Sequence, residues 1–139
     1  MLPWSSLSSD LARDDAAVAR HPCPPGWLAE PDRLSHAAIS DPANSVYVSA
    51  ASGWEIATKV RLGKLPGIGE LLNDLPQLLI AQGFELLPIT LQQGMHAGSY
   101  PMPHRDPFDR LLAAQAELAR LTLVSVDPAL QAFPCRLLW

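Results

Sequence analysis

Residues 46–62 read VYVSAASGWEIATKVRL, a short apolar run that passes directly into a segment with helical periodicity. The run 46–48 predicts a strand, because β-branched and aromatic residues favour extended backbone. A turn signal, Asp41-Pro42-Ala43-Asn44, precedes it. The apolar residues after it recur at helical spacing as far as Leu62, and Gly63 can end that helix. A strand that leads straight into a helix is the repeating unit of an α/β fold.

The chain beyond this unit repeats the alternation of strand-length and helix-length apolar segments. Gly83 can end one helix and Thr90 can cap the next. The helices expected are 70–82, 91–98 and 107–120, and the strands expected are 84–89, 121–126 and 137–138. This order predicts an α/β domain with a mostly parallel sheet.

Length, apolar runs, cysteines and net charge limit the kinds of protein that this chain can be. The 139 residues fit one domain, and no apolar run approaches the roughly 18 to 20 residues of a membrane span. The N-terminus lacks the pattern of a secretory signal, so a cytoplasmic protein is expected. Cys23 and Cys135 lie far apart and form no metal-ligand spacing. The net charge of −4 argues against binding nucleic acid by charge alone, although a nuclease can be acidic where a bound cation reverses the local sign.

Four acids stand where strands are expected to end or helices to begin: Glu55, Asp106, Asp109 and Asp127. Helix capping explains each of them singly. Ser52 and Glu55 have the spacing of a capping box. Asp106 can be an N-cap before a proline, Asp109 favours the positive end of the helix dipole, and Asp127 can cap a short terminal helix.

Taken together, the same acids indicate a metal site. The carboxyl ends of parallel strands share one edge of the sheet, which is where ligands bind. Carboxylates that converge there repel one another unless a divalent cation lies between them, and oxygen ligands suit Mg²⁺ or Mn²⁺. The sequence therefore predicts that Glu55, Asp109 and Asp127 share a cation.

Three stretches resemble the PIN-domain toxins of the VapC kind. Residues 46–65 resemble the second-acid region of that family, residues 104–116 its third-acid helix, and residues 121–127 its fourth-acid strand. The resemblance places a PIN domain at 27–139. It implies a three-layer α/β/α fold, cleavage of RNA phosphodiesters by metal-activated water, a homodimer, and inhibition by a cognate VapB-like antitoxin.

Carried over by position, the resemblance assigns site residues. Glu55, Asp109 and Asp127 match the metal-binding catalytic acids, and Asp106 matches an auxiliary carboxylate. Candidate contacts to RNA are Lys59, Arg61, Arg110 and Ser125. A solvated helix face explains Lys59 and Arg61 equally well.

The family's first strand, which ends in aspartate, has no counterpart here. Residues 15–25 predict no strand and supply no aspartate in the right setting. Their possible codons, read one nucleotide later, permit a leucine-rich strand that ends in aspartate, threonine and histidine, and a nucleotide lost near Gly26 and Trp27 would restore the frame. The hypothesis is that residues 1–26 are an out-of-frame translation, a non-native or disordered segment outside the domain.

Loss of that strand removes one carboxylate and the central member of the sheet. We therefore expect this polypeptide to be weakly active or inactive. Even mutation of residues that only orient the metal ligands often lowers metal affinity or activity by about 10 to 100-fold. A catalytically silent PIN module that binds an antitoxin or itself is the alternative within the family. A phosphoacceptor signalling domain, which also gathers acids at strand ends, is the alternative outside it.

Overall fold

Strand β2 and helix α3 form the unit expected from the sequence. The computed structural model describes residues 17–19, 37–65, 67–125 and 127–138. Strand β2 spans Val46–Ser49 and α3 spans Ala50–Arg61. The turn at Asp41 that precedes β2 is present, because its carboxylate accepts from the Ala43 amide at 2.8 Å and its carbonyl from the Asn44 amide at 3.0 Å. Strand and helix thus join without an intervening loop.

The later elements also follow the expected order. Helices α4, α5 and α6 span Leu75–Ala81, Leu91–Ser99 and Pro107–Ala119. Strands β3, β4 and β5 span Glu85–Leu87, Thr122–Val124 and Arg136–Leu138. The 3-10 helices η1 and η2 span Gly69–Leu71 and Pro128–Ala132. The expected helix 70–82 is wrong in its first half, since it divides into η1 and α4. The reason is Pro76, which has no N–H to continue a helix and fits only the first turn.

The caps explain where α5 and its neighbours begin and end. Thr90 and Gln93 form a capping box at the start of α5, with bonds of 3.0 and 3.2 Å. Gly83, after α4, has a φ of 87°, which favours glycine. These two signals were present in the sequence, and both predicted boundaries are confirmed.

The sheet has the order β3-β2-β1-β4-β5. Strand β2 is parallel to β3, and β4 is parallel to β5. Strand β1, Ala17–Ala19, lies between β2 and β4 and is antiparallel to both, with Val18 opposite Tyr47 and Leu123. The expectation of no strand within residues 15–25 is therefore wrong at 17–19. The flanking strands are buried, and their inner edges need hydrogen-bond partners, which a short segment of small and β-branched residues can supply. The rest of the segment 1–26 lies outside the described residues.

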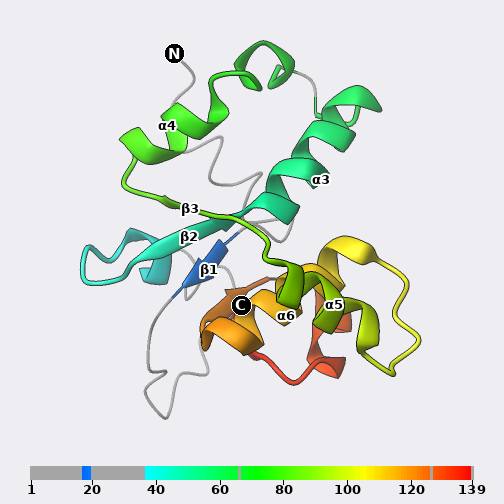
Figure 1. Cartoon of the computed structure of the whole chain (residues 1–139). Coiled ribbons are helices and arrows are strands. Elements are labelled where there is room, and N and C mark those ends of the chain that lie inside the picture. Colours follow the sequence, from blue (N-terminus) through cyan, green and yellow to red (C-terminus); the bar gives the residue numbers. More distant parts are fainter. Residues whose placement is uncertain (1–16, 20–36, 66, 126, 139) are drawn as a thin grey trace.

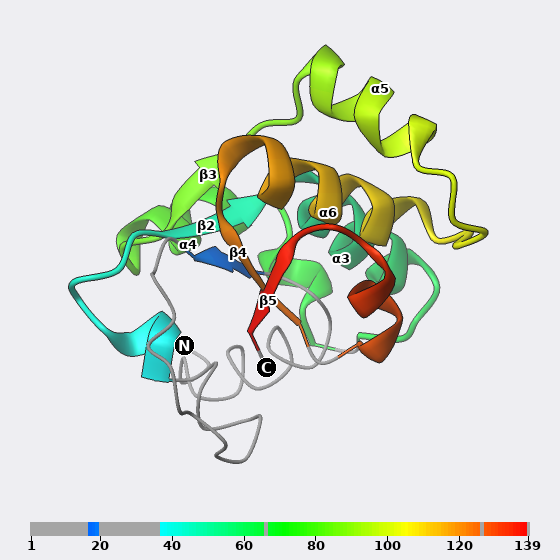
Figure 2. The same ribbon diagram turned by 90° about the horizontal axis from the view of Figure 1, so that it is seen from below.

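Helices cover both faces of this sheet. Helices α3 and α4 lie on one side, whereas α6 lies on the other with α5 packed along it (Figure 1, Figure 2). The two faces have separate cores. Val48 and Ile56 pack with the leucines of α4 on the first face. Leu112 and Leu123 are fully buried on the second face, in the cluster that includes Tyr100 and Phe133.

Within the described part of the chain, no helix has both the length and the apolar composition needed to cross a bilayer.

Candidate active site

Glu55 lies in the second turn of α3, and it is not a capping residue. The N-cap of α3 is Ser49, whose hydroxyl oxygen accepts from the Ala51 amide at 3.0 Å. The helix therefore begins three residues before the predicted capping box, and Ser52 is inside it and buried. The carboxylate of Glu55 instead pairs with Lys59 Nζ at 3.0 Å, one turn further on. The capping explanation for Glu55 is wrong.

The start of α6 is built as the sequence predicted. Asp106 is the N-cap, and its carboxylate accepts from the Phe108 amide at 2.9 Å. Pro107 takes the first helical position, where no N–H is required. Asp109 stands in the first turn but is only 4% exposed, and its Oδ2 lies 2.6 Å from His104 Nε2. A buried carboxylate with a side-chain partner has a more specific role than dipole compensation at a surface.

Asp127 follows β4 and caps η2, as predicted. Its carboxylate accepts from the Ala129 amide at 2.8 Å. Its own amide donates to the hydroxyl oxygen of Ser125 at 3.1 Å. Ser125 is 2% exposed, so this hydroxyl is placed to hold the turn that carries Asp127.

Two contacts join the N-terminal half of α3 to α6. The rings of Trp54 and Phe108, which precede Glu55 and Asp109, meet edge to face with centroids 4.7 Å apart. About two turns further along α6, the side chain of Gln115, which is fully buried, accepts from the Ser49 hydroxyl. Gln115 also donates to the Pro88 carbonyl at 3.0 Å and to Gln93 Oε1 at 3.2 Å. The loop after η2 reaches the same region, since the ring of Phe133 lies 5.3 Å from that of His104.

These contacts do not bring the carboxylates around one ion. Glu55, Asp109 and Asp127 offer oxygen ligands, which are the right chemistry for Mg²⁺ or Mn²⁺. Each of them, however, has its own partner within the chain. No three acidic, histidine or cysteine side chains among residues 17–19, 37–65, 67–125 and 127–138 come close enough together to hold a metal. The carboxylate oxygens suit Mg²⁺ or Mn²⁺ chemically, but the described side chains are not arranged to bind such an ion together.

The candidate RNA contacts divide into two groups. Arg61 is exposed in the last turn of α3, and Lys59 beside it is paired with Glu55. Arg110 is engaged by main-chain carbonyls, with donor distances from 2.7 to 3.3 Å. Ser125 is buried. Of the four, Arg61 is the one whose side chain lies exposed to solvent, where a phosphate can reach it.

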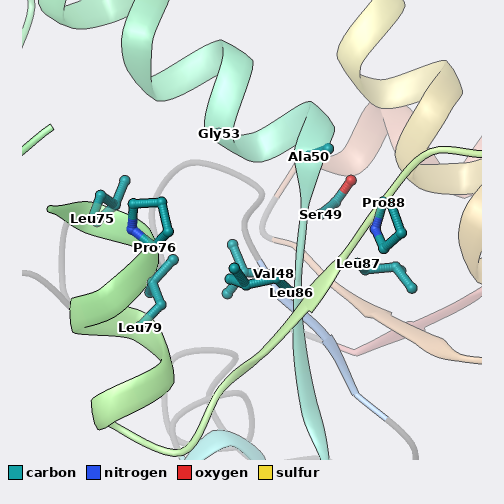
Figure 3. Close-up of a pocket in the computed structure, with 10 residues that line it drawn as sticks. All are labelled: Val48, Ser49, Ala50, Gly53, Leu75, Pro76, Leu79, Leu86, Leu87 and Pro88. Carbon is teal, nitrogen blue, oxygen red and sulfur yellow. The ribbon is translucent and has the colours of Figure 1, made fainter. Parts of the chain in front are cut away.

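A pocket of about 320 Å³ lies between α3, α4, β2 and β3 (Figure 3). Its walls include Val48, Leu75, Leu79 and Leu86, and none of its lining residues is charged. Phosphate groups need cations or N–H donors, so this pocket does not suit an RNA backbone. It is separate from the carboxylates, although Gly53 of its wall is close to Glu55 in sequence.

Sequence reasoning missed two residues of this region. His104 looked like an isolated histidine, yet it is the partner of Asp109. A histidine two residues before an N-cap aspartate, with a second aspartate in the first turn, is the signal that could have found it. Gln115 gave no signal, because a glutamine on a helix is usually a surface residue.

The family is shown by comparison of the sequence with known proteins. The PIN domain model matches residues 27–134. Ribonuclease VapC16 of Mycobacterium tuberculosis (strain ATCC 25618 / H37Rv) is 44% identical over 65 residues. That alignment covers 47% of this chain and 44% of the relative, so the chain spans under half the length of the curated relative it matches. No solved structure matches the chain. With strands and helices in the order described, and a family model that covers most of its length, the chain belongs to the PIN domain family.

Proposed function

We propose that the chain is a VapC-like endoribonuclease toxin of a type II toxin-antitoxin system, and that this exact polypeptide cleaves RNA weakly or not at all. Membership of the PIN family and the similarity to a ribonuclease support the first part. The proposed site residues are Glu55, Asp109 and Asp127 as metal-binding acids, with Asp106 as an auxiliary. The proposed partners are an RNA substrate, a VapB-like antitoxin in the cytoplasm and a second copy of the chain.

One observation carries the second part of the proposal. Glu55 and Asp109 each follow a ring of the contact between Trp54 and Phe108, but the described residues contain no group of three donors that could hold an ion. The pairs with Lys59 and His104 each use one oxygen of a carboxylate, which has two that can accept, so it is the lack of convergence among the described acids that supports the weak activity. No cleavage step through a metal follows from this arrangement.

The proposal includes a domain boundary and an origin for the first residues. The PIN domain begins at residue 27 with the family's three-layer α/β/α design, and residues 1–26 are an out-of-frame translation. The antiparallel direction of β1 supports this, since it runs against both of its neighbours in an otherwise parallel arrangement. Sequencing the coding DNA tests it. The nucleotides for residues 15–27 should encode a strand ending in aspartate when read one nucleotide later, and any other reading refutes the frameshift.

A cleavage assay tests the function. The purified chain is incubated with labelled RNA, with and without Mg²⁺ or Mn²⁺, beside Glu55→Gln and the exposed control Glu70→Gln. We expect the chain and both variants to give the same low background. A second protein, in which residues 1–26 are replaced by the strand read in the shifted frame, should cleave RNA only with metal and lose that activity with Glu55→Gln. Strong metal-dependent cleavage by the original chain contradicts the reduced activity, and no cleavage by the repaired chain contradicts the nuclease function.

A catalytically silent PIN module is the second candidate, favoured by the same lack of a three-donor group in the described residues. It would bind an antitoxin or itself. Binding of the antitoxin encoded beside it, together with an inactive repaired chain, would favour this candidate over the nuclease.

A further inference from the structure

The guanidinium of Arg110 is saturated by main-chain carbonyls. Nε donates to Ala97 at 2.9 Å. One terminal nitrogen donates to Met102 at 3.1 Å and to His104 at 2.9 Å, and the other donates to Gly98 at 3.3 Å and to Tyr100 at 2.7 Å. An arginine has five N–H donors, and all five are used here. Arg110 therefore has no donor left for a phosphate, and its role differs from the RNA contact suggested by the sequence.

The five carbonyls belong to the end of α5 and to the loop that leads to α6. The last carbonyls of a helix have no partner within the helix, and a cation there also opposes the negative end of the dipole. The loop needs such support, because Pro101 and Pro103 have no N–H to donate. Among the residues that the structure describes, no hydrogen bond between main-chain atoms fixes 101–105. Arg110 is the cross-link that holds this segment against α6.

The end of this loop carries the partner of Asp109. The carbonyl of His104 is bound by Arg110, while its ring is 2.6 Å from the Asp109 carboxylate and packs edge to face on Phe133. The guanidinium also lies over the ring of Tyr100, 5.9 Å from its centre. The position of the His104 ring therefore depends on a loop that Arg110 organises.

We propose that Arg110 is a positioning residue for Asp109, acting through the 97–104 segment and the ring of His104. The importance of Arg110 for RNA cleavage rests on the proposed function, whereas its effect on the position of Asp109 does not. Lysine keeps the charge at this place but not the planar fork of donors, so Arg110→Lys removes most of the cross-link without removing the cation.

The test uses two readouts that require neither RNA nor metal. Amide hydrogen exchange reports the end of α5 that Arg110 holds, and the carboxyl carbon resonance of Asp109 reports its surroundings. Arg110→Lys should speed exchange by about tenfold or more at the amides of 97–99, in the last turn of α5, and should shift the Asp109 resonance. The matched control is Arg105→Lys, at an exposed arginine of the same loop, and it should change neither.

His104→Ala separates the loop from the ring, because Arg110 binds the carbonyl of His104 and not its side chain. This variant should shift the Asp109 resonance and leave exchange at the amides of 97–99 unchanged. Adding Arg110→Lys to it should speed exchange but produce no further shift of that resonance.

Three results would overturn the proposal. The first is an Arg110→Lys protein with normal exchange and an unmoved Asp109 resonance. The second is an equal effect of Arg110→Lys on that resonance with and without His104, because Arg110 would then act by another route. The third is a His104→Ala protein whose Asp109 resonance does not move from that of the unmodified chain, because the ring would then not position the carboxylate. This comparison does not require a folded Arg110→Lys protein.

Discussion

The second turn of α3 and the first turn of α6 carry the two best-matched acids, but they hold them in different ways. Glu55 pairs with Lys59 on the same helix, four residues away, and both side chains keep some exposure to solvent. Asp109 is buried, and its partner His104 comes from a loop that Arg110 fixes by five bonds. The first pair is local and can separate easily, whereas the second depends on the tertiary structure. The acid on α3 should therefore be the more available of the two, and the acid on α6 the more important for stability.

Removing the link between Ser49, the N-cap of α3, and Gln115, in the middle of α6, should have the largest effect. Gln115 is fully buried, and Gln115→Ala would leave a cavity and deprive the Ser49 hydroxyl and the Pro88 carbonyl of their partner. We expect a loss of about 3 kcal/mol in the free energy of unfolding, measured in urea. Gln131→Ala, at an exposed glutamine, is the control and should change little. A loss below about 1 kcal/mol would show that the buried network does not hold the two helices together.

Truncation of the two acids tests the contrast directly. Asp109→Ala leaves His104 without its partner in a mostly buried place, and should lower the free energy of unfolding by about 2 kcal/mol. Glu55→Ala breaks a partly solvated pair and should cost less than about 0.5 kcal/mol. Equal losses in the two variants, under the same urea titration, would remove the distinction between a tertiary and a local pair.

A second histidine–carboxylate pair, at the other end of α6, shows how such a pair depends on pH. Glu117 accepts from the Tyr100 hydroxyl at 2.7 Å and lies 2.8 Å from His96 Nε2. The hydrogen bond from Tyr100, and next that from His96, lower the pKa of Glu117. Burial, followed by the hydrogen bond to Glu117, raises the pKa of Tyr100, so the phenol remains a donor.

Because the pKa of Glu117 is lower in the folded than in the unfolded chain, its contribution to stability is present above the unfolded value and is lost as the pH falls through the folded value. Glu117→Gln should therefore weaken the loss of stability on acidification, measured by urea unfolding from pH 7 downward. Glu70→Gln, at an exposed acid of η1, is the matched control. An unchanged acid dependence in Glu117→Gln would contradict the assignment.

The smallest effect is expected at the local pair itself. Lys59→Ala should cost about 0.3 to 0.5 kcal/mol at low salt, the usual contribution of a pair one helical turn apart. The loss should fade in 1 M salt, where charges are screened within about 3 Å. The control is Arg61→Ala, at an exposed residue of the same helix. The stability of both variants is measured by thermal unfolding at low salt and in 1 M salt. A larger loss that salt does not change would mean that Lys59 stabilises the fold by packing.

These two helix starts also show what sequence reasoning can reach. Asp106 and Pro107 are adjacent in the chain, and local rules predicted their roles at the start of α6, whereas the pairing of Asp109 with His104 was not predicted. The capping box at Ser52 failed, because Ser49 offers an earlier cap that also bonds to Gln115, far away in the sequence. Thr90 had no such competitor, and its predicted capping role is confirmed.

Other features depend on contacts that no local pattern encodes. The five acceptors of Arg110 are main-chain carbonyls, whose availability depends on where α5 ends and how the loop turns. Strand β1 lies between β2 and β4 and is antiparallel to both, although the sequence pattern predicted no strand there. Periodicity predicted the elements, whereas the partners of buried polar groups required the structure.

The central claim is that, among the residues that the structure describes, Glu55, Asp109 and Asp127 form no three-donor group that could hold a cation. A titration of the purified chain with Mn²⁺, followed by electron paramagnetic resonance, tests it most directly. We predict no stoichiometric Mn²⁺ site and the same weak binding in Asp109→Asn and in the exposed control Asp74→Asn. Stoichiometric Mn²⁺ binding that Asp109→Asn abolishes and Asp74→Asn preserves would contradict the account.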